Sequence, residues 1–193
     1  KDEQGNTPIL SAVAKAQTIL LEREKSKTYI TPQGVQGFID GMLGLILGEN
    51  SPVLMADRVA AVQAPGGCGS LRILAELLTR VNKDTKVWIS DPTWANHIPL
   101  MGNAGLSLET YPYFDKATAS IRFDAMMDTL RKVKKGDVVL LHGCCHNPTG
   151  ADLTKEQWQQ VVEVAKEREF LPFVDLAYQG FGDGLEEDAY GVR

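Results

Sequence analysis

Short apolar runs alternate with helical segments through the second half of this chain, and no other sequence feature constrains its fold as strongly. The predicted strands are residues 86–90, 106–111, 137–141 and 171–175, and the helices predicted between them are residues 95–101, 123–132 and 157–167. Strands joined by helices require right-handed βαβ crossovers. The pattern therefore predicts an α/β fold, with a mainly parallel sheet that helices cover on both faces.

The first half of the chain predicts further elements of the same kind. A helix is expected over residues 7–27, followed by a loop and a second helix through residues 38–46. Residues 59–63 then predict a short strand, residues 64–70 a glycine-rich loop and residues 71–81 a helix. No linker or repeat interrupts the pattern, so the chain is expected to be one domain or most of one.

The composition and charge of the chain argue against some classes of binding partner. The chain has 193 residues, a formal net charge of −5 and no basic block, which argues against binding nucleic acid or an anionic membrane. Its longest apolar run is shorter than the roughly 20 residues of a membrane span, and its start lacks a signal-peptide core. The three cysteines include an adjacent pair, which is not a disulfide framework. We expect a cytoplasmic protein that acts on small molecules.

Ligands of an open α/β sheet lie beyond the carboxyl ends of its strands, where four polar loops of this chain are expected. Their sequences are PGGCGS (65–70), DPTWANH (91–97), HGCCHNPTG (142–150) and VDLAYQGF (174–181). The sequence therefore predicts a site built from these loops.

The loop PGGCGS has two interpretations. Successive glycines let backbone N–H groups converge, and the positive end of the following helix adds to them, which suits a phosphate group. The loop lacks the lysine of a P-loop, however, and Arg72 stands where a Gly-x-Gly-x-x-Gly pattern needs its third glycine. A tight turn that requires positive φ explains the glycines equally well.

The loop HGCCHNPTG offers ligands for a metal and a thiol nucleophile. His142, Cys144, Cys145 and His146 are plausible zinc ligands, but adjacent cysteines do not match the usual spacing of a zinc site. Nothing in the sequence marks either cysteine as activated. Asn147 is the stronger candidate, because an amide held beside Pro148 can donate to a ligand oxygen without changing charge.

The remaining two loops carry aromatic and charged candidates. Trp94 is suited to stack on a flat ring, or to pack, and His97 is either catalytic or structural. Asp175 ends an apolar run, so its carboxylate needs a hydrogen-bonded or cationic partner, such as a protonated ring nitrogen. Tyr178 can reach the same pocket with its phenol. The alternative for Asp175 is that it caps a helix.

Together, PGGCGS, SDPTWANH, HGCCHNPTG and DLAYQGF resemble the class I aminotransferases that depend on pyridoxal phosphate, the aspartate and aromatic amino acid group. The segments DPTWANH, TYPYFD and EEDAY resemble the aromatic branch most closely. The resemblance implies that residues 1–193 form most of the N-terminal half of the large cofactor-binding domain, with residues 1–50 as a helical segment at the dimer interface and substrate side. It also implies a homodimer with shared active sites.

The same resemblance implies roles for individual residues. Asp175 would pair with the pyridinium nitrogen of the cofactor, while Asn147 and Tyr178 would donate hydrogen bonds to its phenolic oxygen. Asp175, Tyr178 and Trp94 would be the catalytic residues of this chain, with Trp94 stacked on the ring.

Further roles concern the phosphate and the surroundings of the aspartate. Gly67 and Cys68 would hold the phosphate, although Cys68 replaces the hydroxyl residue usual in the family. Tyr29 would reach the phosphate of the neighbouring subunit. His97 and His142 would surround the residues that touch the cofactor, and His97 in particular would support Asp175.

The implied reaction is ping-pong transfer of an amino group between an aromatic or dicarboxylic L-amino acid and a 2-oxo acid such as 2-oxoglutarate. The family's Schiff-base lysine follows the DLAYQGF segment, whereas the last lysine here is Lys166. We therefore expect the chain to be an internal fragment without the small C-terminal domain and inactive by itself. An aspartate-specific enzyme and a non-catalytic protein of the same fold are the alternatives. A nicotinamide-dependent oxidoreductase is disfavoured because its glycine pattern is absent.

Overall fold

The computed structural model describes residues 3–193, which divide into two compact units. The first unit ends at Pro32 and contains α1 (Ser11–Arg23), none of whose residues is buried. The predicted helix over residues 7–27 was therefore too long at both ends. No side chain caps the first turn of α1, and no core packing holds the residues that flank it, so the helix ends where its own hydrogen bonds end.

The second unit, Gln33–Arg193, is built on a four-stranded parallel sheet. Its strands are β1 (Lys86–Asp91), β2 (Ser107–Pro112), β5 (Val138–His142) and β6 (Leu171–Asp175), in the order β2-β1-β5-β6. β1 pairs with β2, the next strand along the chain, on one side and with β5 on the other side. The strand order thus reverses between β1 and β5, which is where folds of this type bind their ligands.

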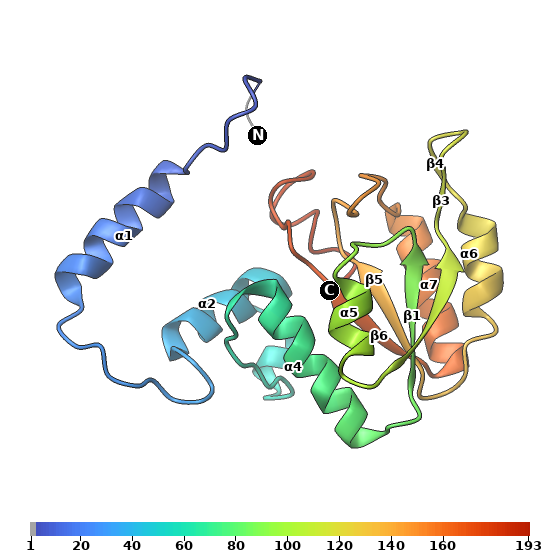
Figure 1. Cartoon of the computed structure of the whole chain (residues 1–193), viewed down its shortest axis with the longest axis horizontal. Coiled ribbons are helices and arrows are strands. Elements are labelled where there is room, and N and C mark those ends of the chain that lie inside the picture. The colour runs from blue at the N-terminus through green and yellow to red at the C-terminus, as the bar shows by residue number, and fades with distance from the viewer. Residues whose placement is uncertain (1–2) are drawn as a thin grey trace. The chain divides into compact units, whose positions relative to one another are not determined.

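Helices cover both faces of this sheet, as the sequence predicts (Figure 1). One face packs against α4 (Gly66–Val81) and α5 (His97–Gly102), and the other against α6 (Phe123–Leu130) and α7 (Lys155–Arg168). Successive residues of β5 enter opposite cores: Leu140 packs on the α4 side and Leu141 on the α7 side. A strand buried on both faces has no polar side, which is why β5 reads as a continuous apolar run.

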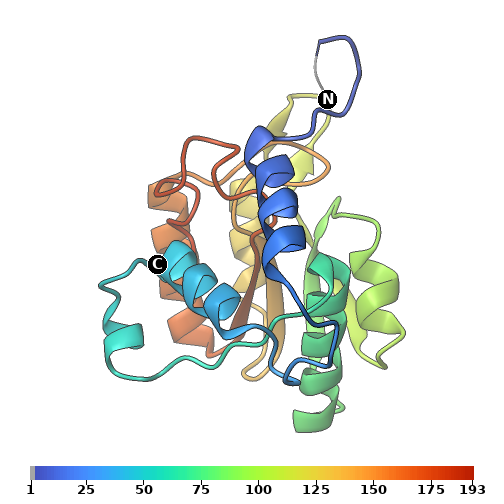
Figure 2. The same cartoon turned by 90° about the vertical axis from the view of Figure 1, so that its left-hand side faces the viewer.

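The remaining elements lie around this layered core. They are α2 (Gln36–Leu47), α3 (Pro52–Met55) and an antiparallel pair formed by β3 (Phe114–Asp115) and β4 (Ser120–Ile121). In Figure 2 the end of α2 lies beside the C-terminal end of the chain. None of the helices formed by the described residues is long and apolar enough to cross a membrane.

The predicted strand at residues 59–63 is wrong. These residues alternate between half-buried and exposed, as a strand would, but within residues 3–193 no strand pairs with them. The backbone N–H of Gln63 donates instead to the carbonyl of Gln33, at 2.8 Å. Alternation describes an extended backbone with one buried side, and it does not show that a neighbouring strand is present to complete a ladder.

The helix predicted over residues 71–81 begins five residues earlier than expected, at Gly66. The segment PGGCGS is therefore the first turn of α4 and not a loop between a strand and a helix. Gly66 has φ +71°, a backbone conformation that favours glycine, so this glycine is explained by the turn into the helix.

Candidate active site

The predicted site loops meet at one edge of the sheet. DPTWANH follows β1, HGCCHNPTG follows β5 and DLAYQGF follows β6, and His142 and Asp175 are partners in the β5–β6 register. Because all these strands are parallel, their carboxyl ends lie at the same edge. The structure thus brings together three segments that begin at residues 91, 142 and 175 of the sequence.

Asp175 ends β6 and contacts a histidine from α5. The Nε2 atom of His97 lies 2.8 Å from the Oδ2 atom of Asp175, and the His97 side chain is fully buried while that of Asp175 is 21% exposed. The contact is compatible with the support of Asp175 by His97 that the resemblance implies, and that role stays a prediction. No helix follows β6 among the described residues, so Asp175 does not cap one.

Thr93 connects His97 to a second histidine. Its Oγ1 atom lies 2.7 Å from Nδ1 of His97 and 3.2 Å from Nε2 of His142. A hydroxyl has one proton, so if it donates to Nδ1 of His97, its oxygen accepts from Nε2–H of His142. That assignment leaves Nε2–H of His97 to donate to the carboxylate of Asp175, which gives one consistent chain of donors ending at Asp175.

His142 is also part of a stack of three rings. Its ring centroid lies 4.0 Å from that of His146, which in turn lies 4.0 Å from the ring of Tyr113. Hydrogen bonds occupy both nitrogens of His146: Ser90 Oγ lies 3.0 Å from Nε2 and Thr149 Oγ1 lies 2.9 Å from Nδ1.

These contacts give both histidines of HGCCHNPTG hydrogen-bonding partners within the fold. In the part of the chain that the structure describes, no group of three or more histidine, cysteine and acidic residues is arranged to hold a metal ion. The carboxylate of Asp152 accepts from the backbone N–H groups of Cys145, at 2.6 Å, and His146, at 2.8 Å. Asp152 thus holds the turn at the centre of the segment.

Burial keeps the two stacked histidines neutral. It lowers the pKa of His142 to about 3, with the neighbouring His146 and His97 rings adding to the effect. Burial likewise lowers the pKa of His146 to about 4. At neutral pH both rings are uncharged, and each can donate and accept one hydrogen bond, as the contacts require.

The cysteines do not form an activated nucleophile. Burial is the main cause that raises the pKa of Cys144 to about 12, and the nearby carboxylate of Asp188 contributes to this rise. Burial is also the largest cause of a raised pKa at Cys145. Because the thiolate is the reactive form, neither thiol is prepared for attack at neutral pH.

Asn147 and Tyr178 line a common pocket of 320 Å³, with Cys145, His146, Pro148 and Phe181. An amide and a phenol thus face one cavity from loops that follow neighbouring strands. Trp94 belongs to the loop that follows β1. Its ring contacts that of His97 edge to face, with 5.4 Å between the ring centroids, and it packs against the core on the α4 side. Trp94 therefore has a packing role, whatever else it does.

The candidate phosphate residues lie in the first turn of α4, where Gly67 and Cys68 are exposed. No side chain caps this helix terminus, and although the N–H of Gly66 donates to the carbonyl of Ala64, the first turn of a helix has further N–H groups that suit an anion. Tyr29 lies in the first unit, where its side chain is exposed. The roles assigned to these three residues stay predictions.

Sequence reasoning missed Ser90, Thr93, Tyr113, Thr149 and Asp152. Thr93 lies inside the DPTWANH segment and Thr149 inside HGCCHNPTG, so their positions beside predicted site residues were a usable signal. Ser90 lies inside SDPTWANH and Tyr113 inside TYPYFD, but neither segment indicated a contact with His146. They become neighbours of His146 only through the packing of β1, β2 and β5.

Residues 1–193 match the family described as aminotransferase class I and II. The chain belongs to this family. Its relatives include a tyrosine aminotransferase from Klebsiella pneumoniae, 46% identical over 193 residues, and an aspartate aminotransferase from Escherichia coli (strain K12), 44% identical. Each comparison covers 100% of this chain and 49% of the relative, so the chain spans about half the length of these curated relatives.

Solved structures of aminotransferases have the same fold. An aromatic-amino-acid aminotransferase from Burkholderia pseudomallei, covalently bound to pyridoxal phosphate, matches with a TM-score of 0.97 and 44% identity, over 100% of this chain and 48% of that chain. The predicted family and the predicted α/β fold with its parallel sheet are both confirmed.

Proposed function

We propose that this chain is the part of an aminotransferase that holds pyridoxal phosphate, and that the complete protein transfers an amino group between an L-amino acid and a 2-oxo acid by a ping-pong mechanism. The observation that carries the proposal is the hydrogen bond between buried His97 and Asp175 at the end of β6. A carboxylate supported in this way, at the carboxyl end of a parallel sheet, suits a cationic ring nitrogen.

The side chains at this edge fit the functional groups of pyridoxal phosphate. Asn147 and Tyr178 line one pocket and can both donate to the phenolic oxygen of the cofactor. The uncapped first turn of α4 suits its phosphate, with backbone donors compensating for the missing hydroxyl at Cys68. When bound, pyridoxal phosphate supplies an electron sink for bond cleavage at the substrate Cα.

The residues of this chain would determine the protonation state of the cofactor's ring nitrogen. Asp175, as a carboxylate, would keep the ring nitrogen protonated. His97 would donate to Asp175 and hold it in place, and Thr93 would fix the His97 tautomer in which Nε2 carries the proton. Trp94 would cover one face of the ring and exclude water from it.

The substrates we propose are aromatic or dicarboxylic L-amino acids, with a 2-oxo acid such as 2-oxoglutarate as the acceptor. The segments DPTWANH, TYPYFD and EEDAY support the aromatic branch, although identities of 46% and 44% to the tyrosine and aspartate enzymes are nearly equal. We also propose a cytoplasmic homodimer, in which Tyr29 reaches the cofactor phosphate of the other subunit. An aspartate-specific enzyme is the alternative.

The decisive experiment is borohydride reduction of the complete protein with pyridoxal phosphate, followed by intact mass and peptide mapping. We expect one cofactor per chain, attached to a single lysine. Absence of a specific adduct would leave a non-catalytic protein of this fold. Where the adduct forms, kcat/KM for tyrosine, phenylalanine and aspartate with 2-oxoglutarate then separates the aromatic from the aspartate-specific enzyme.

A further inference from the structure

The helix α2 is held at its first turn by the segment that leads into α4. The backbone N–H of Val35, the residue before α2, donates to Oε1 of Gln63 at 2.8 Å. A glycine permits this approach, because a Cβ atom on Gly34 would lie 2.3 Å from Cβ of Gln63. Gln63 precedes Gly66, the first residue of α4, by three positions, so α2 starts beside the segment that ends in the candidate phosphate turn.

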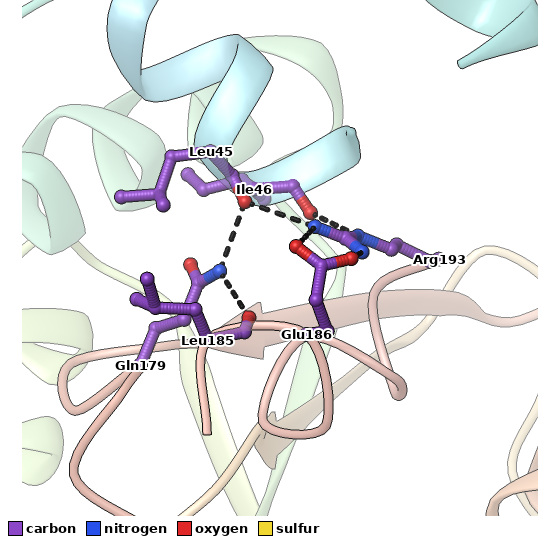
Figure 3. Close-up of polar contacts among 6 residues, drawn as sticks. All are labelled: Leu45, Ile46, Gln179, Leu185, Glu186 and Arg193. Carbon is purple, nitrogen blue, oxygen red and sulfur yellow. Dashed lines mark hydrogen bonds and ion pairs between the residues drawn. The ribbon is translucent and has the colours of Figure 1, made fainter. Parts of the chain in front are cut away.

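The last turn of α2 is held by the segment that follows β6 (Figure 3). Nε2 of Gln179 donates to the carbonyl of Leu45, at 2.9 Å, and to that of Leu185, at 2.8 Å. Arg193 donates to the carbonyls of Leu45, at 3.1 Å, and Ile46, at 3.0 Å, and pairs with Glu186. The last carbonyls of a helix lack partners within it and favour cations, so both donors meet a need of α2.

Gln179 directly follows Tyr178. The position of the Tyr178 side chain therefore depends on the backbone that the two residues share. The Tyr178 side chain is 42% exposed, and its hydroxyl forms no hydrogen bond with any residue that the structure describes. The turn after it is organised by Asp188, whose carboxylate accepts from the N–H groups of Gly180, Gly182 and Asp183. Those bonds shape the turn internally, whereas Gln179 ties it to α2.

We propose that Gln179 is a positioning residue for Tyr178, and that α2 acts as a brace between the phosphate turn and the Tyr178 loop. The side-chain amide of Gln179 faces two carbonyl oxygens, so its NH₂ group is the part of the amide that can bind both. This inference rests on the proposed function, in which the Tyr178 phenol donates to the phenolic oxygen of pyridoxal phosphate.

The test uses four variants of the complete protein. Gln179→Met keeps the length of the side chain and removes its donor, whereas Gln179→Lys keeps a donor beside the same carbonyls. Gln159→Met is the matched control, because the exposed side chain of Gln159 on α7 donates to the Tyr190 hydroxyl and, within residues 3–193, to no other residue. Tyr178→Phe removes the phenol hydroxyl itself.

Two readouts separate positioning from general destabilisation. Hydrogen exchange of residues 178–183, measured without cofactor, reports the anchoring of the loop, and we expect Gln179→Met to accelerate it about tenfold, the effect of losing one or two hydrogen bonds. The pH midpoint of the bound cofactor's visible absorbance reports the phenol. We expect Gln179→Met to raise this midpoint in the same direction as Tyr178→Phe, and Gln179→Lys to match the wild type in both readouts.

The outcomes also distinguish this proposal from the proposed function. Equal loop exchange in Gln179→Met and Gln159→Met would overturn the role of Gln179, whatever the absorbance shows. Faster exchange with the midpoint unmoved in Gln179→Met, but raised in Tyr178→Phe, would overturn it as well, because the loop would then be anchored without positioning the phenol. If Tyr178→Phe itself leaves the midpoint unchanged, the role proposed for Tyr178 fails, while faster exchange would still support Gln179 as the anchor of the loop.

Discussion

At the scale of single residues, the candidate site contains a carboxylate, Asp175, that is held by a histidine from helix α5. Asp175 contacts His97, His97 contacts Thr93, and Thr93 contacts His142, with distances of 2.7 to 3.2 Å. Each group in this series forms a hydrogen bond with the next one. A change at any one of them therefore alters the environment of the Asp175 carboxylate.

Replacing Asp175 tests this arrangement directly. In Asp175→Ala we expect kcat of the complete enzyme to fall about 100-fold or more, since one preorganised electrostatic contact is worth that much. Cofactor binding should change less, because the phosphate and ring contacts remain. Steady-state kinetics and cofactor titration measure the two effects. Asp128→Ala is the control on the exposed surface of α6, and equal kcat in both variants would contradict the role of Asp175.

The buried neutral histidines predict how stability depends on pH. The pKa values of His142 and His146 are lowered to about 3 and about 4, whereas both rings titrate near 6.5 in the unfolded chain. Between these values the unfolded state binds more protons than the folded one. The free energy of unfolding must therefore fall as pH decreases from about 6.5 toward 4, by at most about 1.4 kcal/mol per pH unit for each histidine.

The variant His146→Phe keeps a ring in the stack and removes one titrating group. Its free energy of unfolding should be lower than that of the wild type at neutral pH, because Ser90 and Thr149 lose a partner. Its decline between pH 6.5 and 4 should nevertheless be shallower. Urea unfolding at a series of pH values measures both quantities, and parallel curves for the two proteins would show that His146 does not contribute.

At the scale of elements, α7 illustrates how local sequence fixes a helix start. The Thr154 hydroxyl accepts from the backbone N–H of Gln157, at 3.2 Å, and the Gln157 side chain accepts from the backbone N–H of Thr154, at 2.9 Å. This reciprocal pair is a capping box, and it satisfies two donors at the helix terminus. The helix that follows places Trp158 and Val161 in the core beside β5.

Removing this cap should cost a predictable amount. Thr154→Ala should lower the free energy of unfolding by about 1 kcal/mol, the usual effect of losing a side-chain cap. Gln160→Ala, at an exposed position of the same helix, should change it by less than about 0.5 kcal/mol. Chemical denaturation of both variants makes the comparison. If the two losses are equal, the capping box contributes nothing beyond helix propensity.

At the scale of the whole second unit, the central strand β5 of the sheet is buried on both faces. Leu140 and Leu141 are adjacent in β5, yet they belong to separate hydrophobic cores, one under α4 and α5 and the other under α6 and α7. This arrangement isolates the centre of the sheet from water and leaves its carboxyl edge as the place where polar loops gather. The same arrangement keeps the His97–Asp175 pair next to a rigid support.

Because Leu140 and Leu141 are each buried in one of the two cores, we expect a truncation at either position to destabilise the protein to a similar extent. Leu140→Ala and Leu141→Ala should each lower the free energy of unfolding by roughly 2–5 kcal/mol, as for other buried leucines. Val162→Ala, on the exposed side of α7, should cost far less. Denaturant unfolding is the measurement. A small loss at either leucine would mean that one face of the sheet is not packed as described.

The sequence by itself determined the layered architecture and the identity of the site loops. Strands such as β5 carry a pattern in every residue, because burial on both faces demands an uninterrupted apolar run. Asp175, Asn147 and Tyr178 stand in segments that resemble one family, so they could be proposed as site residues without coordinates. The extents of α1 and α4, and the absence of a strand at residues 59–63, were not, because element ends and strand pairing depend on neighbours.

Only the tertiary structure decided which residues surround these segments. The stack of Tyr113, His146 and His142 joins the residue after β2 to the segment 142–150, and the hydrogen bond from Gln179 to Leu45 spans 134 positions. Neither contact has a periodic or local signature in the sequence. A local pattern reports which face of an element is buried, whereas the partner on that face depends on how the whole chain closes its strands around one sheet.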